Sequence, residues 1–174
     1  MPLPILVSSE KTIPVSVRWS EPDRDEGGWI RFQVPLDIGG LTESGLVLEG
    51  GTYMRHPDRN VSFELCLLGL GRNRRIPLVR VDWKSLRGGH SNQPKHGCIC
   101  KIKRVPPTHI HTFEDNWNAD RAEMKRGDLP CAEPVTEDLQ SFESLRDYVG
   151  SRFRINNISV VPRPDWRYDL FSED

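Results

Sequence analysis

The chain concentrates its histidines in one short stretch. Of its five histidines, His90, His96, His109 and His111 lie between residues 90 and 111. The imidazole ring titrates near neutral pH, and its unprotonated nitrogen is a common metal ligand. A histidine cluster can therefore transfer protons or hold a metal ion, and any chemistry of this chain is predicted to lie here.

The sharpest local pattern in this stretch is His-x-His. If residues 108–112 form a strand, alternation places His109 and His111 on one face and turns Ile110 toward the core. Two imidazoles on one face can bind a metal ion or serve as acid and base around a scissile bond. Two solvent-facing histidines on an edge strand would give the same pattern, so the spacing leaves both interpretations open.

Further polar groups precede the histidine pair. Arg80 and Asp82 alternate with the apolar residues of segment 79–83, so they share one face of a predicted strand. His90 and Asn92 follow in a loop and add an imidazole and a carboxamide. Arg80 and Asp82 could form an ordinary ion pair. The concentration of all these groups in one region nevertheless favours a candidate site.

The same region carries most of the unbalanced positive charge. Residues 70–105 contain ten Lys or Arg and one acid, a net charge of +9, whereas the whole chain has −1. Such a patch can attract phosphates or an acidic partner, or it can pack against the acidic flanks of the same chain. The candidate substrate-binding residues are Arg72, Arg74, Arg75, Lys101, Lys103 and Asn92.

The cysteines indicate free thiols. Cys66, Cys98, Cys100 and Cys131 are even in number, but the chain is large and carries no export signal, which favours reduced thiols and a cytoplasmic location. The spacing of Cys98 and Cys100 is poor for structural zinc. In a strand, Cys98, Cys100 and Ile102 would form a buried apolar face.

Length and composition bound the fold. A chain of 174 residues with 28% charged residues is typical of one compact globular domain over residues 1–174, and no apolar run is long enough for a membrane span. Within it we distinguish a β-rich part (1–60), a core with the candidate site (61–160) and a proline-rich tail (161–174).

Hydrophobic periodicity predicts the elements. The apolar N-terminus is interpreted as an edge strand, and Asn118 and Thr136 as N-caps of helices over 118–124 and 137–149. The fold class is therefore α+β, an antiparallel sheet of short strands covered by one longer and one short helix. The predicted strands cover residues 12–19, 29–34, 45–49 (closed by Gly50-Gly51), 61–68, 76–83 and 153–161.

These motifs also carry a family resemblance. Arg80-x-Asp-Trp83, His90-x-Asn92 and His109-x-His-x₂-Glu114 resemble the Asp…His-x-Asn…His-x-His core of an uncharacterised bacterial family associated with mobile elements and toxin–antitoxin-like loci. The resemblance covers about residues 60–160. That family is in turn distantly similar to toxins that cut RNA, so the resemblance implies an RNA-cutting activity.

Three functions follow as hypotheses. The first is metal-independent RNA cleavage, in which His109 and His111, with His90 as substitute, supply base and acid. Arg80, Lys101 and Lys103 would then stabilise the charge that develops on phosphorus.

The second hypothesis is a zinc or manganese site made of Asp82, His90, His109 and His111. The third is a non-catalytic module of a defence or toxin–antitoxin type system that binds an acidic protein through a basic hairpin at residues 69–75. Interface anchors for such a module, or core residues, are Trp19, Trp29, Trp83, Trp117 and Trp166.

Overall fold

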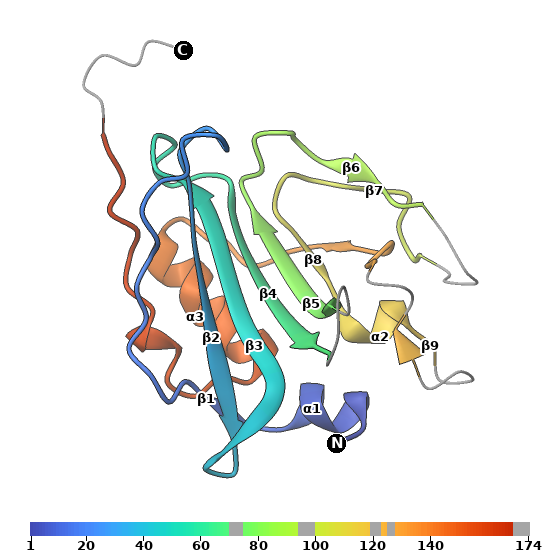
Figure 1. Ribbon diagram of the computed structural model, residues 1–174. Coiled ribbons are helices and arrows are strands. Elements are labelled where there is room, and N and C mark those ends of the chain that lie inside the picture. The colour runs from blue at the N-terminus through green and yellow to red at the C-terminus, as the bar shows by residue number, and fades with distance from the viewer. Residues whose placement is uncertain (70–74, 94–99, 119–122, 125–127, 169–174) are drawn as a thin grey trace.

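A computed structural model gives the architecture of the chain (Figure 1). It describes all residues except 70–74, 94–99, 119–122, 125–127 and 169–174. The fold is α+β, as predicted. A seven-stranded antiparallel sheet has the order β1-β2-β3-β4-β5-β8-β11, and one long and two short helices accompany it.

Four consecutive strands form the centre of the sheet. β2 (Trp29–Ile38), β3 (Leu41–Tyr53), β4 (Val61–Leu68) and β5 (Arg75–Trp83) follow one another as antiparallel hairpins. β2 and β3 are longer than predicted, because Gly50 and Gly51 lie inside β3 and pair with Phe32 and Arg31 instead of closing the strand. The boundaries of β4 and β5 agree with the predicted 61–68 and 76–83 to within one residue.

Short strands complete the sheet and flank it. β1 (Lys11–Thr12) lies at one edge, and β8 (His109–His111) and β11 (Glu133–Pro134) lie beyond β5. Two small hairpins stand apart from the main sheet: β6 (His90–Ser91) pairs with β7 (Arg104–Val105), and β9 (Trp117–Asn118) pairs with β10 (Glu123–Met124).

The core lies between one face of the sheet and α3 (Phe142–Phe153), which runs behind the strands in Figure 1. The rings of Phe63 and Phe142 are 6.1 Å apart. The buried indole N–H of Trp83 donates to the carbonyl of Leu139, just before the helix, at 2.9 Å. Within the described residues no helix covers the other face of the central strands (Figure 1), whose outward side chains include Trp29, Arg31, Glu49, Glu64 and Arg80.

The helix begins five residues later than predicted. Ser141, not Thr136, is the N-cap, because Ser141 and Ser144 form reciprocal hydrogen bonds in a capping box. The apolar face of the helix, from Phe142 to Val149, is nevertheless buried. The helix runs on past Gly150 and ends at Arg154 in the left-handed conformation (φ 58°).

Three further element predictions are wrong. The N-terminus forms a helix, α1 (Leu3–Ser8), in which Pro4 occupies the first turn, where a missing N–H costs nothing. Of the predicted strand 12–19, only Thr12 lies in a strand, at the end of β1. Residues 158–160 form a 3₁₀ helix instead of a strand, since Ile155, Ile158 and Val161 are buried at a spacing of three.

The predicted helix over 118–124 is also wrong at both described ends, which form β9 and β10. The short helix lies earlier in the chain, as α2 (Phe113–Asn116), capped by the Thr112 hydroxyl. None of the helices within the described residues is long and apolar enough to cross a membrane.

A buried lysine joins the N-terminal segment to the end of α3. The Lys11 ammonium donates to the carbonyls of Val7 (2.9 Å), Ser9 (2.7 Å) and Phe153 (3.1 Å). Burial and the neighbouring Arg154 lower the pKa of Lys11 to about 8, so the side chain remains mostly charged at neutral pH. One cation thus satisfies carbonyls at two helix ends.

We expect Lys11→Met to lower the free energy of unfolding by about 2–3 kcal/mol, because three buried carbonyl oxygens lose a charged donor. Urea denaturation measures this change. Lys103→Met, at an exposed position, is the matched control and should leave the midpoint within error. Equal stabilities of the two variants would show that the buried ammonium contributes nothing net.

Candidate functional site

Pairing between β5 and β8 brings the predicted residues together. Arg80 lies opposite His111 and Asp82 opposite His109 in adjacent antiparallel strands. Residues directly opposite each other in such a pair have side chains on the same face. The four predicted residues therefore share the face that α3 leaves open, while Ile110 lies in the core, as predicted.

A two-stranded arm, β6 with β7, brings the third histidine over this pair. At its base Gly88 has φ +73°, and a Cβ on Gly89 would lie 1.9 Å from the carbonyl oxygen of Val105. Only glycine allows the two backbones of the arm to approach this closely. His90 follows immediately and faces His109.

Asn92 anchors the arm rather than facing a ligand. The residue is buried, and its amide donates to the carbonyls of Ile102 (2.8 Å) and Ala132 (2.7 Å). Its side-chain oxygen accepts from the Ala132 N–H at 3.1 Å. The predicted substrate-binding residue therefore holds the segment that carries His90 in place.

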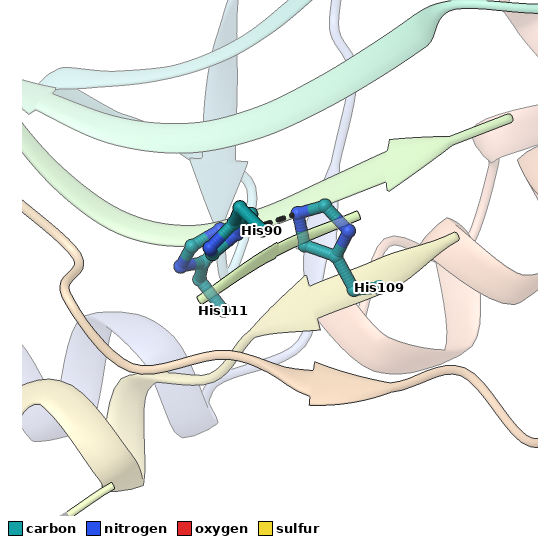
Figure 2. Close-up of side chains that lie close together, drawn as sticks. All are labelled: His90, His109 and His111. Atoms are coloured by element: carbon teal, nitrogen blue, oxygen red, sulfur yellow. Dashed lines mark hydrogen bonds between the residues drawn. The ribbon is translucent and has the colours of Figure 1, made fainter. Parts of the chain in front are cut away.

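The three imidazoles converge on one point (Figure 2). His90, His109 and His111 each offer one nitrogen, and these three atoms lie within 4.8 Å of one another. Nε2 of His90 and Nε2 of His109 are 3.2 Å apart. Tetrahedral zinc, with Zn–N bonds of about 2.0–2.1 Å, requires nitrogens roughly 3.3 Å apart, so this pair already has the spacing of two zinc ligands.

Backbone carbonyls select the tautomers. Nδ1 of His109 lies 2.8 Å from the carbonyl oxygen of Pro106, and Nδ1 of His90 lies 3.3 Å from that of Ser91. A carbonyl oxygen only accepts, so Nδ1 carries the proton in both rings. In neutral rings both Nε2 atoms would then present lone pairs to each other, an arrangement that a cation or a shared proton between them would satisfy.

Asp82 adds a negative charge beside these nitrogens. Its Oδ1 accepts from Arg80 at 2.7 Å, and its Oδ2 lies 3.5 Å from Nε2 of His109 and 3.9 Å from Nε2 of His111. Burial opposes ionisation, but the contacts with His109 and Arg80 outweigh it and lower the pKa of Asp82 to about 2. An ionised carboxylate only accepts hydrogen bonds, and Arg80 already donates to Oδ1, so Oδ2 is the oxygen that faces the histidines.

His111 is neutral under ordinary conditions. Burial lowers the pKa of this ring to about 4, against the attraction of Asp82. A neutral imidazole is the form that ligates metals. The site thus places a neutral His111 and one carboxylate beside the imidazoles of His90 and His109.

The site opens into a cavity of about 410 Å³. Arg87 and segment 128–130 line this cavity, although sequence reasoning did not select them. For Arg87, its place in the basic stretch was a sequence signal that could have identified it. No sequence signal pointed to residues 128–130, because they are separated from the histidines along the chain. The complete lining is Arg80, Asp82, Ser85, Arg87, Gly88, Gly89, His90, Ser91, Gln93, His109, His111, Asp128, Leu129 and Pro130.

Arg75, Lys101 and Lys103, the other basic candidates that the structure describes, do not line this cavity. Arg75 forms ion pairs with Glu49 and Glu64 on the open sheet face. Lys101 pairs with Asp115 at 2.8 Å, and Lys103 is exposed. The remaining candidates, Arg72 and Arg74, and the fourth histidine of the cluster, His96, lie outside the described residues.

A disulfide joins the arm to the cavity wall. Cys100 and Cys131 are bonded, so the prediction of reduced thiols is wrong for this pair, and residues 100–102 do not form a strand. The two cysteines meet because Asn92 and Asn116 bind the backbone of Ala132 and Cys131. Cys66 is free and buried, whereas Cys98 lies outside the described residues. The cytoplasmic location stays a prediction.

We expect the double variant Cys100→Ser/Cys131→Ser to lower the free energy of unfolding by about 3–4 kcal/mol, from the entropy of closing a loop of this length. Urea denaturation with and without a reductant measures it. The reductant should destabilise the wild type by a similar amount and leave the double variant unchanged. A wild type that is insensitive to full reduction would contradict the expectation.

Comparisons of the chain with protein-family models, with curated proteins and with solved structures found no match. The function is therefore argued from the geometry of the site.

Proposed function

We propose that His90, His109 and His111 bind a divalent metal ion, most favourably zinc, and that the metal-loaded site cleaves RNA. The observation that carries this proposal is the convergence of three imidazole nitrogens within 4.8 Å, two of which are 3.2 Å apart. Nitrogen ligands in this number are typical of zinc, whereas manganese favours carboxylate and water.

The outer contacts fit a catalytic metal site. His109 and His90 direct Nδ1 to backbone carbonyls, an arrangement that fixes the ring and raises the basicity of the ligating nitrogen. Three protein ligands leave a fourth position for water, and a bound zinc ion would lower the pKa of that water and polarise a phosphoryl oxygen. Asp82 Oδ2, which lies 3.5 Å from Nε2 of His109 and 3.9 Å from Nε2 of His111, could then orient that water.

Positive charge around the cavity favours a phosphate ester as substrate. Arg80 and Arg87 line the cavity together with the histidines. Guanidinium groups bind phosphate oxygens in bidentate fashion and stabilise the charge that develops on phosphorus during cleavage. The sequence resemblance to RNA-cutting toxins supports RNA over other phosphate esters.

A specific observation also supports the metal-independent mechanism. A proton on Nε2 of His109 would lie between Asp82 Oδ2 and His90 Nε2, and it would satisfy both acceptors without a metal ion. His109 would then be an imidazolium and could act as a general acid. The convergence of the third ring favours the metal, because an acid and a base acting in line on phosphorus need opposite sides of the substrate.

Zinc binding is the first test. Isothermal titration of protein without an affinity tag should show an equimolar site for zinc. His109→Ala should weaken zinc binding by more than about a hundredfold. A loss of this size exceeds the one expected for a residue that only hydrogen-bonds to a metal ligand. His56→Ala removes a histidine in the connection between β3 and β4, where it packs on Tyr53, and should leave binding unchanged. Equal affinities of the wild type and His109→Ala would exclude the site.

Cleavage of a short fluorescent single-stranded RNA is the second test. We expect products with zinc, none with EDTA, and a rate at least about a hundredfold lower for His90→Ala or His109→Ala, because each removes a metal ligand. Gel electrophoresis measures the rate. Cleavage that persists in EDTA would favour the metal-independent mechanism, and intact RNA under both conditions would refute RNA cleavage altogether.

A further inference from the structure

The face of the sheet opposite α3 forms a surface, hollowed by adjoining cavities, that leads away from the histidine site. Besides the site cavity, cavities of about 250 Å³ and 650 Å³ open on this face. Arg80 lines all three. The surface therefore extends from the histidines on β8 across β5, β4 and β3 to Trp29 on β2, and no helix covers the front of these strands in Figure 1.

Trp29 lies flat on this surface. A Cβ on Gly51 would lie 2.1 Å from Cζ2 of Trp29, so the indole ring rests directly on the backbone of β3. Tyr53 supports the ring edge-on, with centroids 4.8 Å apart and planes at 75°. The indole is only partly buried and lines both of the outer cavities. Among the described residues, its N–H has no hydrogen-bond partner.

The charges on this surface are distributed unevenly. In its middle, Glu49 and Glu64 are paired with Arg75. Arg31, beside Trp29, and Arg87, beside the histidines, form no ion pair with any described residue. Two guanidinium groups without an ion pair to any described residue therefore line this surface: Arg31 next to Trp29, and Arg87 between Trp29 and the histidines, where it borders both the cavity of Trp29 and the site cavity.

We propose that this open face binds single-stranded RNA, with one base stacked on Trp29 and the phosphates at Arg31 and Arg87. This deepens the proposed function, on which it rests for the cleavage of the bound strand. Aromatic platforms beside cationic groups bind single strands because every base has a stacking face and every linkage a negative charge. The strand would cross β3, β4 and β5, and a phosphate several nucleotides from the stacked base would reach the histidines.

RNA binding can be measured without cleavage. Fluorescence anisotropy of a labelled single-stranded RNA, in EDTA, gives the dissociation constant. Trp29→Ala should raise it about tenfold or more, and Trp29→Phe, which keeps a planar ring, should restore most of the affinity. Arg31→Gln should weaken binding and make it less dependent on salt, because one phosphate contact is lost.

Arg152→Gln is the matched control. Arg152 lies on α3, which packs on the opposite face of the sheet, and its side chain is partly exposed, so the same loss of charge occurs away from the open face. It should change the dissociation constant only slightly. Thermal unfolding of every variant checks that the sheet is intact.

Two results would overturn the inference. One is equal RNA affinity of Trp29→Ala and the wild type. The other is no RNA binding together with tight binding of an acidic peptide such as polyglutamate, which would make the surface a protein interface. The result is separable from the proposed function. If RNA binds in EDTA through Trp29 but is never cut with zinc, the RNA-binding surface is supported and the proposed cleavage is refuted. If RNA is cut in the presence of zinc and Trp29→Ala changes neither binding nor cleavage, the proposed cleavage is supported and the RNA-binding surface is refuted.

Discussion

The whole site depends on the register of a very short strand pairing. β5 and β8 share three residue pairs, Arg80 with His111, Val81 with Ile110 and Asp82 with His109. A shift by one residue would turn both histidines into the core and Ile110 toward solvent. The register is protected because Val81 and Ile110 are fully buried beneath the polar pair, and because a carboxylate and two imidazoles would be costly to bury on the other side.

Around this pairing, side-chain amides replace regular secondary structure. The stretch from Leu129 to Ala132 forms a wall of the site but no strand. Asn92 and Asn116 satisfy its backbone groups, and both amides are buried. The disulfide at Cys131 adds a covalent tie to the arm. The ligand from the arm and the ligands from the sheet thus belong to one supported unit, as precise metal binding requires.

Strong alternation made the central hairpins predictable, whereas the ends of the chain were not. Segment 61–68 alternates over a full strand and segment 76–83 alternates from Val79 to Trp83, and both are strands. The same alternation in segment 12–19 gave no strand beyond Thr12, since Pro14 has no N–H to donate to a neighbouring strand. The start of α3 was misjudged because Thr136 and Ser141 are both suitable caps, and only packing on the sheet selects between them.

The sequence by itself determined which residues could do chemistry. The clustering of His90, His109 and His111 near Arg80 and Asp82, and the alternation that puts each pair on one face, are properties of the chain alone. Only the tertiary structure decided that the arm folds back so that His90 meets His109, that Asn92 serves the backbone and not a ligand, and that Cys100 meets Cys131. These contacts join segments separated in sequence, and their geometry depends on loop conformations for which local periodicity carries no information.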